Sequence, residues 1–163
     1  MAATSELGGT SNPEALDAYL RALKIGFGPY NDKNLLAAAA AYTDALRLDS
    51  GYASAFVGRS VVFNDYASNW ATGPAVNDGF AKAGDDARRA VALAPDLGDA
   101  HLALAYFYTN TLDLPRADEE YARARSLAPG SADGLGLAGV FETQMGRIEA
   151  GLADMHQAVL LDP

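Results

Sequence analysis

Residues 90–95 read AVALAP, and near copies of this stretch recur as ARSLAP at residues 124–129 and as AVLLDP at residues 158–163. The closing prolines of these copies are 34 residues apart both times. A fourth copy without proline, ALRLDS, stands at residues 45–50. Self-similarity at a fixed period of about 20 to 50 residues is typical of stacked repeats. The sequence therefore predicts an array of small repeating units.

The amino-acid composition indicates that these units are helical. The 163 residues include 34 alanines and only two isoleucines. Alanine is the best helix former, whereas β-branched residues favour strands. A proline directly after a helix does no harm, because its missing N–H and fixed φ disturb only a helix interior. We therefore expect each period to consist of helices separated by short turns.

The residue types within the period resemble the tetratricopeptide repeat (TPR), a helix–turn–helix unit of 34 residues. The unit that ends at Pro129 fits best. Where the family prefers Trp, Leu, Gly and Tyr in the first helix, this unit has His101, Leu104, Ala105 and Tyr108. Where the family prefers Ala, an aromatic residue and Ala in the second helix, it has Ala117, Tyr121 and Ala124. Small residues allow two helices to approach closely, and large ones fill the space beside these contacts. The resemblance covers residues 12–163. It implies an all-α fold, a right-handed α-solenoid of about four TPR units.

The expected organisation is a disordered leader at residues 1–12, which are small and polar, followed by a TPR array at residues 13–163. The four units are expected at about residues 13–50, 53–95, 98–129 and 132–163. Boundary signals such as Asn12-Pro13 and Gly146 give eight helices. These are predicted at residues 13–27, 33–48, 53–71, 75–93, 98–110, 115–127, 132–145 and 147–161.

The second unit contains an insertion. Residues 53–95 number 43, whereas residues 98–129 number 32, and the surplus of 11 lies around residues 64–74, with the helix break at Gly73-Pro74. One interpretation is a longer helical hairpin that packs Trp70 on its neighbours. The other is a protruding tip that presents Tyr66 and Trp70 to a partner.

A ligand of such an array is expected on the concave face, which the first helix of each unit lines. The inward positions combine apolar side chains with amides, and they predict a peptide-binding groove formed by Leu23, Phe27, Tyr30, Val57, Val61, Asn64, Leu102, Tyr106, Asn110, Leu137, Val140 and Gln144. Such a groove suits an amphipathic helix or an extended segment. The alternative is that these residues pack against the chain's own leader or a neighbouring domain.

One activity of the family is not expected here. Some TPR proteins bind the C-terminal carboxylate of a peptide through Lys, Arg and Asn on the concave face. In this chain the matching positions hold Leu23, Phe27, Gly58, Asp99 and Ala103. These residues lack the positive charge that a carboxylate requires, so the resemblance does not extend to this activity.

Charge and rare residue types argue against several other classes of function. A formal net charge of −9 with scattered basic residues makes nucleic acid an unsuitable partner, and no apolar run approaches the roughly 18 residues that membrane insertion needs.

The sequence has no cysteine. His101 is expected to pack between helices and His156 to lie at the surface, so no metal site or other cofactor is predicted. The acidic pairs at residues 85–86 and 119–120 stand beside arginines and are expected to form solvated ion pairs, and the chain is not expected to be an enzyme.

These observations predict a protein–protein interaction scaffold that binds a protein or peptide. Residues 12–21 resemble the segment before TPR arrays in bacterial signalling proteins that carry adenylate-cyclase, winged-helix or TolB-like parts, which implies the regulatory or sensory region of a larger protein. The alternatives are a freestanding assembly factor or co-chaperone that binds client peptides, and a helical domain that senses a small molecule. The apolar residues 158–161 of the last helix indicate either truncation or self-association through that helix. A cytoplasmic location is expected, or a periplasmic one if the chain belongs to a longer membrane-anchored protein.

Overall fold

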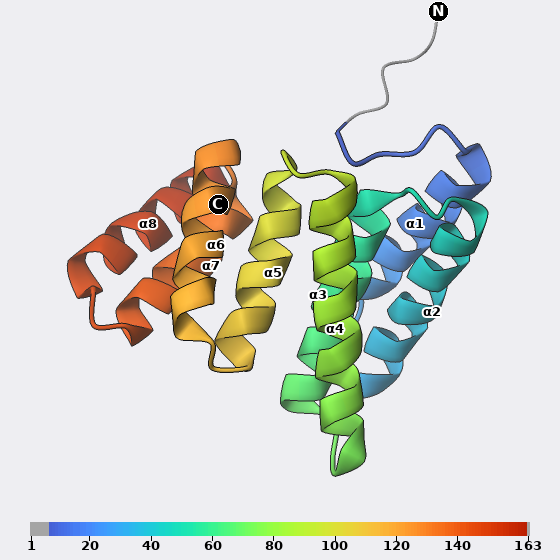
Figure 1. Ribbon diagram of the computed structural model, residues 1–163, viewed down its shortest axis with the longest axis horizontal. Helices are drawn as coiled ribbons and strands as arrows, with labels where there is room; N and C mark the ends of the chain where they lie inside the picture. Colours follow the sequence, from blue (N-terminus) through green and yellow to red (C-terminus); the bar gives the residue numbers. More distant parts are fainter. Residues whose placement is uncertain (1–6, 163) are drawn as a thin grey trace, which may run out of the picture.

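The computed structural model describes residues 7–162, which form eight helices and no strand. The helices are α1 (Pro13–Gly26), α2 (Asp32–Leu48), α3 (Ala53–Asn69), α4 (Pro74–Leu93), α5 (Gly98–Asn110), α6 (Leu114–Leu127), α7 (Ala132–Gln144) and α8 (Ile148–Leu161). They pair in chain order into four hairpins that stack along the long axis of the molecule (Figure 1). The predicted all-α repeat fold is confirmed, and every helix boundary lies within two residues of its predicted position.

Local sequence signals set these boundaries. The side chain of Asn12 accepts hydrogen bonds from the N–H groups of Glu14 and Ala15 at 3.0 and 3.2 Å, directly before the proline that opens α1. Ser131 caps α7 in the same way through the N–H of Gly134. Such caps satisfy N–H groups that have no partner within the helix. Gly146 has a φ of +81°, a conformation that glycine adopts without strain, and it separates α7 from α8.

The core contains small residues where helices approach each other and aromatic residues beside these contacts. One cluster joins α1, α2 and α3 around Ala18, Ala38 and Tyr42, and a second joins α5, α6 and α7 around Ala105 and Phe141. All five side chains are buried. A larger side chain in place of these alanines would separate the helices, so the alanine-rich composition is what allows the units to stack closely.

His101 is buried between helices, in agreement with the prediction. Its Nε2 lies 2.9 Å from the carbonyl oxygen of Pro95, and its Nδ1 lies 2.6 Å from a carboxylate oxygen of Glu120. These contacts link the turn before α5 to α6, since Pro95 ends the second unit and Glu120 belongs to α6. The histidine therefore connects neighbouring units.

The hairpin of α3 and α4 projects beyond its neighbours at the end where the two helices meet (Figure 1). The ring of Trp70 at this end lies 6.1 Å from the ring of Tyr30, and Trp70 remains 40% exposed. Tyr66, by contrast, packs against the core cluster of α1–α3. The insertion is thus a long hairpin that projects and also packs its tryptophan on a neighbour, so it combines features of both interpretations.

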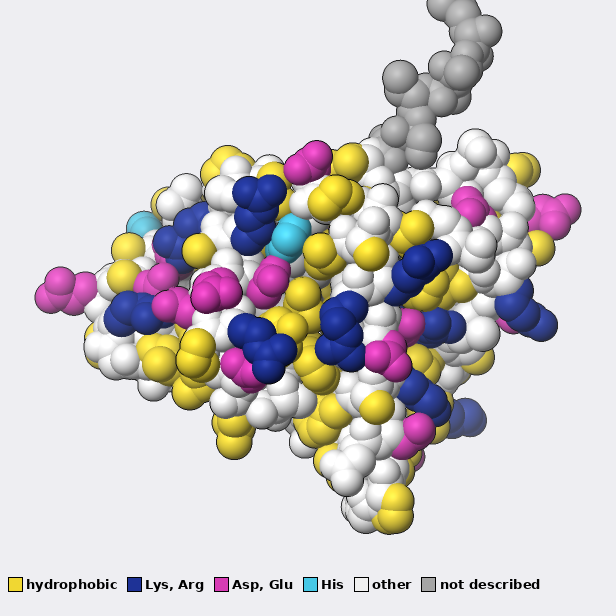
Figure 2. Space-filling model, in the orientation of Figure 1, with side chains coloured by type: hydrophobic (Ala, Val, Ile, Leu, Met, Phe, Trp, Pro, Cys, Tyr) yellow, Lys and Arg dark blue, Asp and Glu magenta, His cyan; other side chains and the backbone are white. Residues whose placement is uncertain are grey.

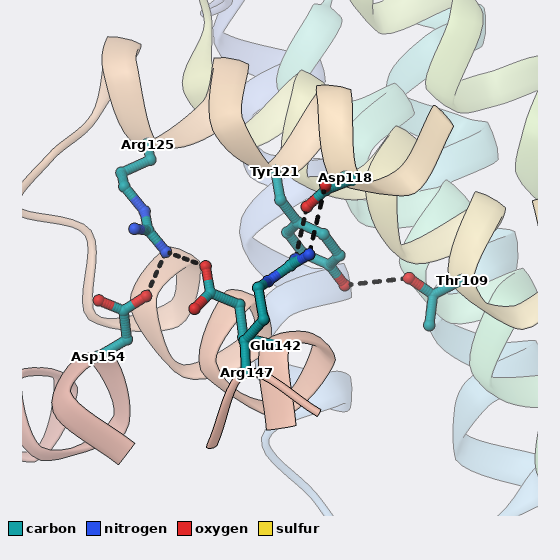
Figure 3. Close-up of polar contacts among 7 residues, drawn as sticks. All are labelled: Thr109, Asp118, Tyr121, Arg125, Glu142, Arg147 and Asp154. Carbon is teal, nitrogen blue, oxygen red and sulfur yellow. Dashed lines mark hydrogen bonds and ion pairs between the residues drawn. The ribbon is translucent and has the colours of Figure 1, made fainter. Parts of the chain in front are cut away.

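Ion pairs join the last two units. Arg125 of α6 contacts Glu142 of α7 at 3.2 Å and also pairs with Asp154 of α8, while Arg147 pairs with Asp118 of α6 at 2.6 Å (Figure 3). The same two units are also joined by an aromatic contact, since the ring of Tyr121 on α6 lies 4.9 Å from the ring of Phe141 on α7. Beyond it, the outer side of α8 exposes apolar side chains, with Ile148, Leu152, Val159 and Leu160 between 51% and 69% exposed.

Part of the expected leader packs against the array. The carbonyl of Gly8 accepts hydrogen bonds from the N–H and the hydroxyl of Ser54, at 2.9 and 3.1 Å. Because the N-cap residue of α3, Tyr52, makes no side-chain cap, Gly8 supplies an acceptor to the start of this helix. Thr10 donates to the carboxylate of Asp49. The leader was predicted to be disordered as far as residue 12; within it, Gly8 and Thr10 make these contacts, and residues 1–6 lie outside the described residues.

Candidate functional site

Two adjoining hollows open between the first helices of the units. The central hollow has a volume of about 380 Å³ and lies between α3, α5 and α7; its lining consists of Val57, Val61, Asp99, Leu102, Ala103, Tyr106, Asp133 and Leu137. The N-terminal hollow, of about 330 Å³, lies beside it between α1, α2 and α3. The two share Val57, Val61 and Asp99, so they form one continuous depression, which we call the groove.

Seven of the twelve predicted groove residues line these hollows. Val57 and Val61 line both hollows. Leu23 and Tyr30 line the N-terminal hollow only, and Leu102, Tyr106 and Leu137 line the central hollow only. The structure therefore brings together an apolar surface from four helices or helix ends that are far apart in the sequence. Leu102 is 8% exposed, which makes it part of the floor of the groove.

The other five predicted residues lie outside the two hollows. Phe27 follows the last residue of α1 and is 88% exposed. Asn64 is 1% exposed, on the side of α3 where Ser60, one turn earlier, donates to the carbonyl of Ala83 in α4. Its side chain has no hydrogen-bond partner among the described residues. Asn64 is therefore a buried residue between helices, and the amide that the sequence suggested for the groove is not accessible there.

The remaining three residues lie near the ends of α5 and α7. Asn110 donates to the carbonyl of Tyr106 in its own helix, at 3.1 Å. Val140 is 45% exposed, and Gln144 is the last residue of α7. The groove is confined to the earlier turns of α7, where Asp133 and Leu137 lie, so these positions continue the same helix face beyond its edge.

Sequence reasoning missed Tyr42, a residue of α2 that reaches the groove. It does so because Gly58 of α3 has no side chain; a Cβ atom at Gly58 would lie 2.3 Å from the ring of Tyr42. The ring also lies 5.7 Å from that of Tyr19, which lines the same hollow. A glycine in the middle of a predicted helix was the available signal, since it marks a close approach by a neighbouring group.

Three carboxylates surround the apolar floor. Asp65 accepts a hydrogen bond from the hydroxyl of Tyr106 at 2.8 Å, and loss of surrounding water raises its pKa above the usual value, an effect that this hydrogen bond partly opposes. Loss of water also raises the pKa of Asp99, and repulsion from Asp133 adds to that shift. Among the described residues, none of the three carboxylates forms an ion pair with a lysine or arginine, and no lysine or arginine lines either hollow.

The outer surface has a different charge pattern. Figure 2 shows basic and acidic side chains interspersed over the face that carries α4 and α6. On α4, Lys82 contacts Asp78 at 2.7 Å and Arg88 contacts Asp85 at 2.8 Å, so these acids are neutralised by neighbours one turn away. Asp86 differs from the predicted solvated pair, because it is buried and bound by Arg59. In the groove, by contrast, Asp65, Asp99 and Asp133 have no lysine or arginine partner among the described residues.

Residues 7–162 offer neither a metal site nor a membrane-spanning helix. No group of three or more histidine, aspartate or glutamate side chains in this range is arranged to hold a metal ion. None of the helices in the same range combines the length and the apolar character needed to cross a membrane.

Comparison with known proteins identifies the fold. No protein-family model matches the sequence, and no curated protein matches it either. Among solved structures, TTC0263, a thermophilic TPR protein of Thermus thermophilus, is similar over 93% of this chain and 76% of its own, with a TM-score of 0.76 and 17% identity. The first TPR of Spaghetti (RPAP3), bound to the HSP90 peptide SRMEEVD, matches 84% of this chain and 99% of its own (TM-score 0.64, 17% identity). MamA from Desulfovibrio magneticus RS-1 is similar over 91% of this chain and 75% of its own, with a TM-score of 0.60 and 15% identity. The chain therefore has the fold of the TPR proteins.

Proposed function

We propose that this chain is a protein-binding scaffold whose groove holds a segment of a partner polypeptide. The observation that carries the proposal is the continuous depression between the first helices of the units, with Val57 and Val61 at the junction of its two hollows. An accessible apolar floor of this kind fits the side chains of an amphipathic helix or an extended strand. The solved TPR of RPAP3 holds a peptide, which is consistent with this use of the fold.

The proposal is tested by selecting binders from a random library of 12-residue peptides displayed on phage. The parent chain is compared with Val61→Gln, which places a longer, polar, uncharged side chain at the junction of the two hollows. Leu160→Gln is the matched control, since Leu160 is 69% exposed on α8, outside the groove. Circular dichroism establishes that all three proteins are folded.

We expect peptides selected on the parent to bind Leu160→Gln equally well and Val61→Gln at least tenfold more weakly. A loss of this size corresponds to about 1.4 kcal/mol, which is within the range for one apolar anchor of a binding segment. Peptides that bind Val61→Gln as well as the parent would place the binding surface elsewhere, and the proposal would then be wrong. A selection that yields no binder would also contradict it.

For the biological role, we propose the regulatory or sensory region of a larger bacterial signalling protein. The support is the resemblance of residues 12–21 to the segment that precedes TPR arrays in such proteins. A reading frame that continues upstream into a cyclase or winged-helix part would support this role. A frame that starts at Met1 and lies among assembly genes would instead favour a freestanding assembly factor or co-chaperone.

A further inference from the structure

We infer that the segment bound in the groove is cationic, with lysine or arginine side chains on both sides of a short apolar stretch. The inference rests on the proposed function and adds the chemistry of the partner. It follows from the three carboxylates of the groove, Asp65, Asp99 and Asp133, and from their arrangement around the apolar floor.

The carboxylates lie at two ends of the groove. Asp99 and Asp133 occupy the first turns of α5 and α7, close enough to repel each other. Asp65 lies in the second half of α3 and is hydrogen-bonded to Tyr106, seven residues after Asp99 on α5. Seven residues of helix correspond to about 10 Å along its axis. Val61 and Leu102 lie in the same hollow, so the floor between the two acidic ends is apolar.

A structural role does not explain this arrangement. An acidic residue in the first turn of a helix interacts favourably with the helix dipole, and this accounts for Asp99 and Asp133 taken singly. It does not account for Asp65, which lies towards the opposite end of its helix, nor for two carboxylates that repel each other. On α4, Asp78 and Asp85 have basic partners, whereas the three groove carboxylates line hollows without one among the described residues. The groove thus keeps an uncompensated negative charge, and a cationic segment complements it.

The geometry also predicts a spacing. A helical partner rises about 1.5 Å per residue, so two basic residues that reach both acidic ends are expected about seven residues apart. An extended partner rises about 3.3 Å per residue, and the expected separation is then about three residues. In either conformation, leucine, valine or aromatic side chains between the basic residues would contact Val61 and Leu102 on the floor.

The same peptide selection tests this inference with a second pair of variants. The triple variant Asp65→Asn, Asp99→Asn, Asp133→Asn removes the groove charges, and asparagine at position 65 still accepts the hydrogen bond from Tyr106. The control is Asp44→Asn, Asp78→Asn, Asp85→Asn, which changes the net charge by the same amount at exposed ion pairs. Affinities of the selected peptides are measured by fluorescence anisotropy at 50 and 500 mM NaCl.

We expect the selected peptides to be enriched in lysine and arginine at the predicted spacing. Their affinity should fall about tenfold for the groove triple variant and less than twofold for the control variant, because partly exposed ion pairs contribute a few-fold each. Added salt should weaken binding to the parent more than binding to the groove variant. Neutral or acidic peptides that lose binding on Val61→Gln would overturn this inference and leave the proposed function intact. Peptides insensitive to Val61→Gln would overturn both.

Discussion

The contact between α7 and α8 depends on two glycines that face each other, and Gly151→Ala tests it. A Cβ atom at Gly151 would lie 2.6 Å from the carbonyl oxygen of Gly139, 2.6 Å from Cγ2 of Thr143 and 3.0 Å from the backbone nitrogen of Thr143. Two of these three atoms belong to the backbone of α7, which a rotamer change cannot move. The helices would have to separate by about 1 Å to reach ordinary van der Waals distances.

Two effects of opposite sign set the magnitude. Overpacking of a well-packed contact destabilises a protein by about 1–3 kcal/mol. Alanine in a helix interior is about 1 kcal/mol more favourable than glycine. Because two of the clashing atoms are backbone, the overpacking cost should lie in the upper part of its range, at about 2–3 kcal/mol. After the helix-propensity gain, we expect Gly151→Ala to lower the free energy of unfolding by about 1–2 kcal/mol. For a chain of this length, that loss corresponds to a decrease in Tm of roughly 3–6 °C.

The matched control is Gly136→Ala on α7. A Cβ atom at Gly136 would meet no heavy atom within 4 Å, so only the helix propensity changes. This variant should gain up to about 1 kcal/mol and melt about 2–4 °C higher than the parent. Thermal unfolding followed by circular dichroism at 222 nm measures both. Equal or higher stability of Gly151→Ala would refute the close approach of α7 and α8.

Three further predictions concern other contacts. Arg59→Met should lower the free energy of unfolding by about 3 kcal/mol, because it leaves the buried carboxylate of Asp86 without its bidentate partner. Urea unfolding measures this loss, and the double variant Arg59→Met, Asp86→Leu should recover most of it. The native state raises the pKa of Asp99, so ionisation of this carboxyl destabilises the fold as the pH rises through that pKa. Asp99→Asn should therefore have a higher Tm than the parent at pH 7, and the difference in Tm should shrink towards pH 4. A difference in Tm that is the same at both pH values would contradict the raised pKa. Tyr30→Ala should shift the emission of Trp70, the only tryptophan, to longer wavelength, whereas an unchanged spectrum would argue against their contact.

The sequence predicted the helices well because several signals agree at some boundaries and the 34-residue period places the others. At the start of α1 a capping asparagine, a proline at the first helical position and an acid in the first turn all favour the same residue. The 34-residue period then divides the helices into pairs, because each period contains one helix–turn–helix unit, and successive units pack against each other in the array. The insertion was also located correctly, because Gly73-Pro74 interrupts any helix and the structure has α4 begin at Pro74.

The groove could be predicted only in part. Periodicity gives the face of a helix, and this was sufficient for Val57, Val61 and Leu102. It does not give the rotation of one helix against the next, which decides that Asn64 is buried towards α4 while Asp65, its neighbour, faces the groove. These rotations follow from side-chain packing across units, and no pattern within one helix contains that information.

The most direct test of the groove is a methyl-NMR titration of the chain with a peptide selected on the parent. We expect the methyl signals of Val57, Val61, Leu102 and Leu137 to shift with the peptide concentration. Signals of Leu112 and Leu160, which are 79% and 69% exposed outside the groove, should stay in place. Shifts confined to Leu160 and the other methyl groups of α8, with the groove signals unchanged, would show that the peptide binds α8 and not the groove.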